Sequence, residues 1–184
     1  MINVYPVETL GRADYGWLQA KYHFSFGDYR NGRRVHFGAL RVINDDIVKA
    51  GNGFDPHPHN DMEIITFVRE GAITHKDSQG NVGRTEAGDV QVMSAGSGIT
   101  HSEYNNESVD TSLFQIWIFP REKGVKPRWD RARFSDRKAK DTLPLLVSGR
   151  PEDENSGALY IHQDASISGG LVEAGQEITQ PIKD

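Results

Sequence analysis

Short apolar or alternating runs follow one another along most of this chain, separated by turns rich in glycine, asparagine and aspartate. Short strands with turn signals every 8 to 12 residues or so are typical of an all-β sandwich or barrel. No segment keeps a helical period over three turns, and the best helical candidate is the polar stretch 130–140. We predict strands within residues 39–43, 63–68, 72–75, 90–93 and 113–119, with turns at 44–46, 70–71, 77–81, 87–89 and 96–98.

The same pattern divides the chain into three parts. Residues 1–130 contain the regular runs and are predicted to form one β-barrel domain. Residues 131–157 read as a connecting segment, because their second half is polar and rich in glycine and proline. Residues 158–184 begin a new unit, with strands expected at 158–162 and 170–173. Two short strands cannot bury a core of their own, so this last part must pack on the first domain or belong to a further unit.

The composition of the chain argues against several classes of function, among them nucleic-acid binding and cysteine-based metal sites. The chain has 184 residues, 36% hydrophobic and 26% charged, with a formal net charge of −5. No large basic cluster is present, so direct binding to nucleic acid is not expected. No apolar stretch approaches the roughly 20 residues that cross a bilayer, and the N-terminus lacks a secretory signal, so we expect a soluble cytoplasmic protein. There is no cysteine, and any metal must therefore be held by nitrogen and oxygen.

His57 and His59 form the first candidate metal-binding pair. On a strand, residues i and i+2 point to the same face, whereas on a helix they would point about 200° apart. A strand would thus present two imidazoles side by side, and neutral imidazole is a good ligand for iron, copper, nickel and zinc. The alternative is a pair of exposed loop histidines, and this motif alone does not decide between the two.

His101 and Glu103 repeat the same spacing after the glycine-rich turn 96–98. Taken alone, they are equally a surface histidine and glutamate after a flexible turn. Two neighbouring strands of a barrel, however, would bring both pairs together, with three nitrogens and one oxygen around one point. Four protein ligands leave an octahedral ion two open positions for water, oxygen or substrate, which is typical of a working site rather than a closed structural one.

The sequence resembles the cupin superfamily and, within it, the pirin family. The first cupin motif is represented by Gly51, His57, His59, Glu63 and Gly71, and the second by Gly88, Asp89, 96–98, His101 and Asn105. The pirin resemblance extends over about residues 10–130. It rests on 24–26 (FSF), 40–46 (LRVINDD), 56–59 (PHPH), 70–71, His75, 77–80, 88–91, 93–96, 98–103 (GITHSE) and 115–118 (QIWI).

The resemblance implies a fold for each part of the chain. Residues 1–130 are expected to form a metal-binding cupin domain, a jelly-roll β-barrel, and residues 158–184 the beginning of a second cupin lobe. That lobe stops before a barrel would close, so an incomplete second lobe is expected. An unpaired sheet edge left there would favour self-association into a homo-oligomer.

The resemblance also implies which carboxylate binds the metal. Cupins in general take it from the first motif, which would be Glu63, whereas pirins take it two residues after the second-motif histidine, which is Glu103. We therefore expect His57, His59, His101 and Glu103 as ligands, with Glu63 near the barrel mouth or behind the ligands. Iron is the first expectation for the metal, with copper, manganese, nickel, cobalt and zinc as alternatives. His75 is expected either to support the ligands or to be structural.

Two functions from different classes follow from the resemblance. In the first, the chain is a quercetin 2,3-dioxygenase-like enzyme whose metal binds a small aromatic flavonol and O₂, with Glu103 as ligand and as the catalytic base. In the second, it is a non-enzymatic metal-binding regulator that binds a transcription factor or a metabolic enzyme, which the acidic charge favours over DNA. Four further residues are expected to line the cavity beside the metal or to pack in the core: Phe54, Met62, Met93 and Gln115.

Overall fold

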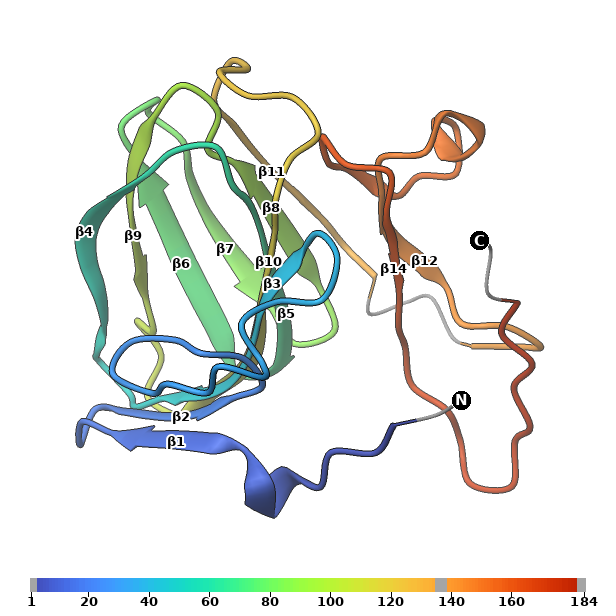
Figure 1. Ribbon diagram of the computed structural model, residues 1–184, viewed down its shortest axis with the longest axis horizontal. Coiled ribbons are helices and arrows are strands. Elements are labelled where there is room, and N and C mark those ends of the chain that lie inside the picture. Colours follow the sequence, from blue (N-terminus) through green and yellow to red (C-terminus); the bar gives the residue numbers. More distant parts are fainter. Residues whose placement is uncertain (1–2, 135–138, 182–184) are drawn as a thin grey trace.

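Two antiparallel β-sheets face each other, and a smaller third sheet lies beside them (Figure 1). The structure is a computed structural model and describes residues 3–134 and 139–181. The larger facing sheet has the strand order β1-β2-β3-β10-β5-β8-β11, and the smaller one the order β4-β9-β6-β7. The third sheet, β13-β12-β14, contains the parallel pair β12–β13.

The strands are short and no α-helix occurs in the described residues. Neither of the two three-residue helices, η1 and η2, is long or apolar enough to cross a membrane. The elements are η1 (Val7–Thr9), β1 (Gly11–Asp14), β2 (Leu18–Tyr22), β3 (Leu40–Val48), β4 (Gly53–His59), β5 (Glu63–Glu70), β6 (Ala72–Asp77), β7 (Val82–Glu86), β8 (Val90–Ser94), β9 (Ile99–Tyr104), β10 (Thr111–Ile118), β11 (Arg128–Ala132), β12 (Leu145–Ser148), η2 (Pro151–Asp153), β13 (Leu159–Tyr160) and β14 (Ser166–Ser168).

The prediction of an all-β cupin barrel is confirmed, but one predicted turn is wrong. Residues 44–46 do not end a strand; they lie inside β3, which pairs with β2 on one side and with β10 on the other. Along β3, Val42, Asn44, Asp46 and Val48 are buried and the residues between them are more exposed. The strand continues through the polar residues because its backbone is hydrogen-bonded on both sides, which outweighs their preference for turns.

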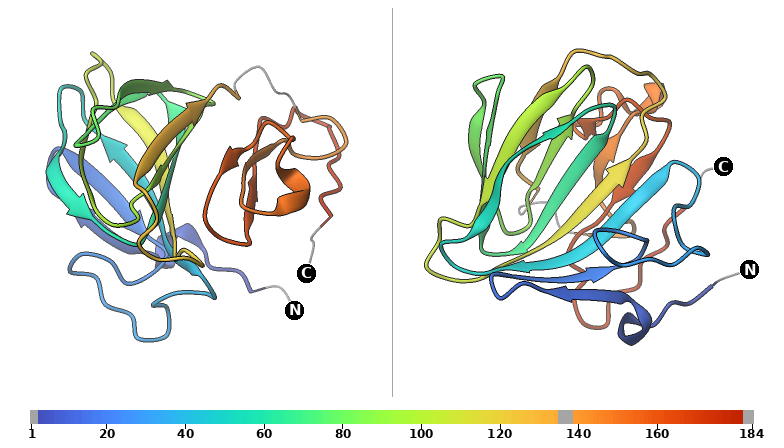
Figure 2. Two further views of the ribbon diagram at one scale, coloured as in Figure 1. Left: turned by 90° about the horizontal axis from the view of Figure 1, so that it is seen from above. Right: turned by 60° about the vertical axis from the view of Figure 1, so that its left-hand side comes forward.

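Strand β8 is buried along its whole length. Its odd- and even-numbered side chains point to opposite faces of the large sheet, so both faces must be covered. The small sheet β4-β9-β6-β7 covers the inner face, and the third sheet covers the outer face (Figure 2). The outer-face cluster joins Val90 and Val92 to Leu146, Val147 and Ile161 of the C-terminal part.

The C-terminal part differs from the sequence expectation in three places. Strand β13 lies within the predicted strand 158–162, but 170–173 forms no strand; the second strand is β14, which ends before Gly169 and Gly170. The segment expected to be only a connection contains β12, the central strand of the third sheet. The helix considered for 130–140 is wrong for its first residues, which belong to β11, and residues 135–138 lie outside the described residues.

Candidate metal centre

A β-bulge in β4 sets two histidines opposite each other. Phe54 pairs with Glu103 and His57 with His101, so β4 has one residue more than β9 between these pairs. Directly opposite residues of an antiparallel pair point to the same face, and the bulge therefore brings His57 onto the inward face of His101. Pro56 lies at this bulge on β4, an edge strand, where a missing backbone N–H costs little.

His59 completes a cluster of three imidazoles. It lies two residues after His57 on β4 and shares its face, as the sequence predicted. One nitrogen from each of His57, His59 and His101 lies within 4.8 Å of the others. The two predicted pairs therefore lie on neighbouring strands, and three of their four side chains form one group.

Two rings of this cluster, those of His101 and His59, are held in their neutral form. Burial, reinforced by the neighbouring rings of His57 and His75, lowers the pKa of His101 to about 3. Burial, together with the rings of His101 and His57, lowers the pKa of His59 to about 4. A neutral imidazole keeps a lone pair, and this is the form that binds a metal.

The unpaired nitrogens fit a transition-metal ion. Nδ1 of His57 donates to the Asp55 carbonyl (2.7 Å), which leaves its Nε2 as the acceptor, 3.2 Å from Nε2 of His101. Nε2 of His59 is buried and has no hydrogen-bond partner in the described part of the chain. Two nitrogens that each lie about 2.1 Å from one ion are roughly 3.0 to 3.4 Å apart, so the observed separation suits shared coordination.

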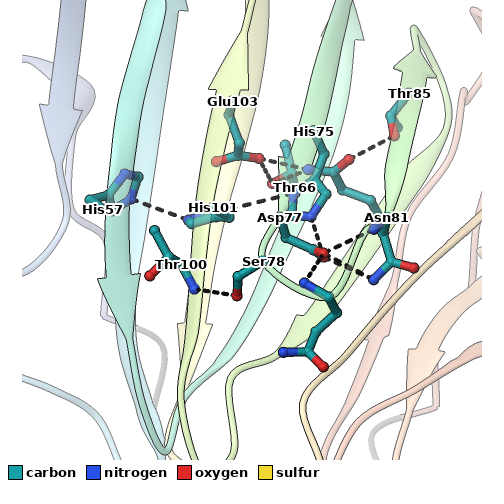
Figure 3. A network of polar contacts seen from close by, with 12 residues as sticks. His57, Thr66, His75, Asp77, Ser78, Asn81, Thr85, Thr100, His101 and Glu103 are labelled. Atoms are coloured by element: carbon teal, nitrogen blue, oxygen red, sulfur yellow. Dashed lines mark hydrogen bonds and ion pairs between the residues drawn. The ribbon is translucent and has the colours of Figure 1, made fainter.

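Behind His101 lies a chain of hydrogen bonds (Figure 3). Asp77 accepts a hydrogen bond from Nε2 of His75 (2.9 Å), and Nδ1 of His75 lies 3.4 Å from Nδ1 of His101. Burial raises the pKa of Asp77, but hydrogen bonds from His75 and Asn81 outweigh it and hold that pKa below its ordinary value. Because Nε2 of His75 donates to Asp77, its Nδ1 can accept the Nδ1 hydrogen of His101, and Nε2 of His101 is then left free for a metal.

The ring of His75 contacts the predicted ligand His101, and it also stacks on Trp129 with centroids 4.9 Å apart. Both positions expected for His75, supporting a ligand and packing in the structure, are therefore compatible with these contacts.

The fourth predicted ligand, Glu103, is buried beside the cluster and held by three donors. Oε1 accepts hydrogen bonds from Gln91 (2.6 Å) and Thr66 (3.2 Å), and Oε2 accepts one from Gln115 (2.6 Å). Glu103 is not part of the group of nitrogens within 4.8 Å. A carboxylate oxygen has two lone pairs, so Oε2 keeps one that is not used by these donors.

Glu63, the alternative carboxylate, lies on the other face of the large sheet. Its Oε2 accepts a hydrogen bond from Ser94 (2.8 Å), and Ser94 shares its face of β8 with Val92, which packs against the C-terminal part. Thr66, at odd spacing from Glu63 on β5, instead reaches Glu103 inside the barrel. The expectation that Glu63 lies near the barrel mouth or behind the ligands is wrong, because the pleat of β5 turns it outward.

A cavity of about 680 Å³ opens beside the histidines and is lined by His57 and His59. Two of the four residues that were expected either to line it or to pack in the core, Phe54 and Gln115, do line it. The other two, Met62 and Met93, pack in a core cluster instead. The remaining walls are mostly aromatic or polar: Trp17, Tyr22, Phe26, Asn44, Asp46, Asp55, Tyr104 and Trp117.

Comparison with protein families supports the resemblance seen in the sequence. The pirin family matches residues 5–118, more than half of the chain. The chain belongs to the pirin family. Within this family, a pirin-like protein of Caulobacter vibrioides is 51% identical over 182 residues, covering 99% of this chain and 78% of that protein.

Matches from Escherichia coli carry a named activity and a bound metal. A protein named quercetin 2,3-dioxygenase is 45% identical over 168 residues, covering 91% of this chain and 70% of that protein. The crystal structure of the bacterial pirin YhhW in complex with nickel(II) has a TM-score of 0.79 to this fold at 45% identity. The match covers 87% of this chain and 67% of that one.

Sequence reasoning missed three residues around the site of this pirin: Asp77, Asn44 and Asp46. Asp77 follows His75 at the same i, i+2 spacing as the two predicted metal-binding pairs, and that spacing is a signal for their contact. Asn44 and Asp46 were taken as a turn. Their even spacing with Val42 and Val48 along one strand face is the signal that would have placed them in the barrel interior.

Proposed function

We propose that this pirin is a metal-dependent dioxygenase acting on quercetin-like flavonols, with iron as its metal. The observation that carries the proposal is the juxtaposition of three clustered imidazoles with an aromatic-lined cavity. Cavities of roughly 300 to 1,000 Å³ are usual for small-molecule sites, and aromatic walls favour a planar ligand. The name of the E. coli relative supports the substrate class.

We assign four ligands to the metal: His57, His59, His101 and Glu103. The neutral rings of His59 and His101, the unpaired Nε2 of His59 and the grouping of His57 with them support the nitrogen ligands. For Glu103, the support is its position two residues after His101 on the same strand face and the free lone pair of Oε2. The nickel(II) complex of the E. coli pirin supports a divalent transition metal.

When bound, the metal supplies a Lewis acid with positions open to a chelating substrate and O₂. The chain's own residues bind the substrate, exclude water and accept a proton. Trp17, Phe54 and Trp117 give the cavity aromatic walls that hold a planar ring and exclude water. Glu103 would accept the proton of the substrate hydroxyl on Oε2 once this oxygen is released from the metal, and the amides of Gln91 and Gln115 keep its carboxylate in place for that transfer.

Oxygen uptake with quercetin tests this function. We expect the iron-loaded protein to consume oxygen in proportion to the quercetin lost, and both metal-depleted protein and a His57→Ala variant to lose this activity. Absence of turnover with iron, copper, manganese, nickel and cobalt would overturn the enzyme proposal. Metal-dependent capture of a protein partner would then favour the regulatory alternative.

A further inference from the structure

The cavity has a second polar wall, formed by Asn44 and Asp46 on β3. Both side chains are 3% exposed and face the barrel interior together with Val42 and Val48. On the neighbouring strand, Ala20 pairs with Asp46 and Tyr22 pairs with Asn44. A buried amide and a buried carboxyl thus sit in a wall that is otherwise apolar or aromatic.

Each of these two residues has a buried side-chain oxygen without a hydrogen bond in the described part of the chain. Oδ1 of Asn44 and Oδ1 of Asp46 are buried, and neither has a hydrogen-bond partner in residues 3–134 and 139–181. Most buried polar atoms in native proteins are paired, because an unpaired one loses its water without replacement. A pair of unpaired acceptors on one cavity wall therefore indicates that something else supplies the donors.

The neighbouring polar side chain does not supply them. Gln115 lies opposite Asn44 in the β3–β10 pair and is the polar residue best placed to reach it. Its Nε2 donates to Glu103 (2.6 Å) and its Oε1 accepts from Nε1 of Trp117 (2.9 Å). Both ends of this amide are engaged on the metal side of the cavity, which leaves the β3 wall without a donor from it.

We propose that Asn44 and Asp46 determine ligand specificity by accepting hydrogen bonds from ring hydroxyls of a polyhydroxylated aromatic ligand. This inference rests on the proposed function, since the ligand is the one whose other end lies at the histidines. Hydroxyl groups bring the donors that both oxygens lack, and the aromatic ring that carries them fits the walls of Trp17, Phe26 and Trp117.

The chemistry of Asp46 favours a neutral hydroxyl over a cation. Burial, followed by the charges of Asp45 and Glu103, raises the pKa of Asp46 to about 8. The cavity therefore holds this carboxyl largely uncharged at neutral pH, and it does not offer the fixed negative charge that a cation would require. An uncharged carboxyl both accepts and donates a hydrogen bond, as a hydroxyl group does.

Equilibrium binding of two flavonols tests the proposal. Nickel(II)-loaded protein is titrated without oxygen with quercetin and with 3-hydroxyflavone, which keeps the 3-hydroxyl and carbonyl but has no hydroxyl on its other rings. Quenching of Trp17 and Trp117, which line the cavity, reports binding. We expect native protein to prefer quercetin by roughly 10- to 100-fold, because the analogue leaves buried polar atoms unpaired.

Three variants test whether Asp46 causes the preference for quercetin over 3-hydroxyflavone. Asp46→Leu is expected to remove most of the preference for quercetin, because it weakens the binding of quercetin and not that of 3-hydroxyflavone. Its unfolding temperature should stay the same or rise, because an unpaired buried carboxyl is gone. Asp46→Asn keeps the shape and one acceptor oxygen, and is expected to lose a smaller part. The matched control is Asp45→Asn on the same strand, whose side chain faces outward to Lys21 and Arg69 and which should keep the native preference.

The inference is overturned if native protein binds both flavonols equally, if both Asp46 variants keep the native preference, or if an organic ammonium ion binds better than either flavonol. A large loss of stability in both Asp46 variants would also overturn it, since the residue would then be structural. These outcomes differ from failure of the proposed function, in which neither flavonol binds to the nickel-loaded protein and no flavonol is oxidised by the iron-loaded one.

Discussion

Two walls of the barrel, one on β9 and one on β3, differ in whether their buried polar groups are hydrogen-bonded. On the β9 wall, Glu103 receives three hydrogen bonds, and His101 is backed by His75 and Asp77. On the β3 wall, Asp46 and Asn44 are equally buried, but their Oδ1 atoms have no partner among the described residues.

This difference in hydrogen bonding indicates a different role for each wall. Side chains that are fully hydrogen-bonded are held in one orientation, which a metal site needs before the ion arrives. Side chains left unpaired reduce stability and remain available to a ligand. The β9 wall therefore has the character of a fixed coordination site and the β3 wall that of a recognition surface. The role of each wall can be tested by substituting the polar residues that distinguish it from the other wall.

The largest effect is expected from His101→Ala. This change removes a ligand nitrogen at the centre of the β9 wall and should reduce nickel(II) affinity by more than about 100-fold, beyond the usual effect of residues that merely support ligands. Isothermal titration with nickel(II) measures it. Ser102→Ala, on the adjacent residue of β9, is the control and should bind as the native protein does. Retention of native affinity in His101→Ala would remove the basis for the site.

Glu103→Gln should reduce metal affinity by roughly 10- to 100-fold, because a neutral amide replaces an anionic ligand and can turn an N–H toward the metal. Glu63→Gln is the matched control on the outer face of the large sheet and should leave affinity unchanged. Metal content after dialysis against a chelator distinguishes the two. The opposite result, with Glu63 required and Glu103 dispensable, would reverse the carboxylate assignment.

Asp77→Asn is expected to weaken metal binding by about 10-fold, although residue 77 touches no metal. An amide at this position can donate to Nε2 of His75, which would then donate from Nδ1 to His101 and place the hydrogen of His101 on Nε2, the ligand atom. Competition with a chelator measures the affinity, and unfolding of the metal-free variant monitors the structure. Ser78→Ala in the same turn is the control; equal affinities in the two variants would rule out the tautomer effect.

The last expected effect is a dependence of stability on pH, with opposite signs for Asp46 on β3 and for the histidines on β4 and β9. The pKa of Asp46 is raised to about 8, so stability from this group is present at low pH and is lost as pH rises from about 4 to 8. The pKa values of His59 and His101 are lowered to about 4 and about 3, so their contribution is present above pH 6.5 and is lost as pH falls toward those values. Each group contributes at most about 1.4 kcal/mol per pH unit.

Urea unfolding of metal-free protein between pH 5 and 8 separates these contributions. The stability of Asp46→Asn relative to native protein should increase with pH, whereas that of His59→Gln should increase as pH falls. Asp45→Asn, on the outer face of β3, is the control for a simple loss of charge. A pH-independent difference for Asp46→Asn would show that this carboxyl is not held uncharged in the folded protein.

The sequence by itself determined the β class, the two histidine-containing pairs and the family. The alternation of apolar residues has the period of a strand, and on a strand residues i and i+2 share one face, so the spacing predicts that His57, His59 and His101 lie together. The choice between Glu103 and Glu63 came from the family resemblance, since spacing treats the two carboxylates alike.

Only the tertiary structure decided which polar residues are buried together. Asn44 and Asp46 look like a turn in isolation, and they became part of a cavity wall because β2 and β10 pair with both edges of β3. The bulge at Pro56 and the outward side of Glu63 also depend on strand register, which is set by contacts between residues distant in sequence. A one-residue change of register moves every side chain to the other face. The alternation along β3 shows which residues share a face, but the pairing of distant strands decides what that face meets.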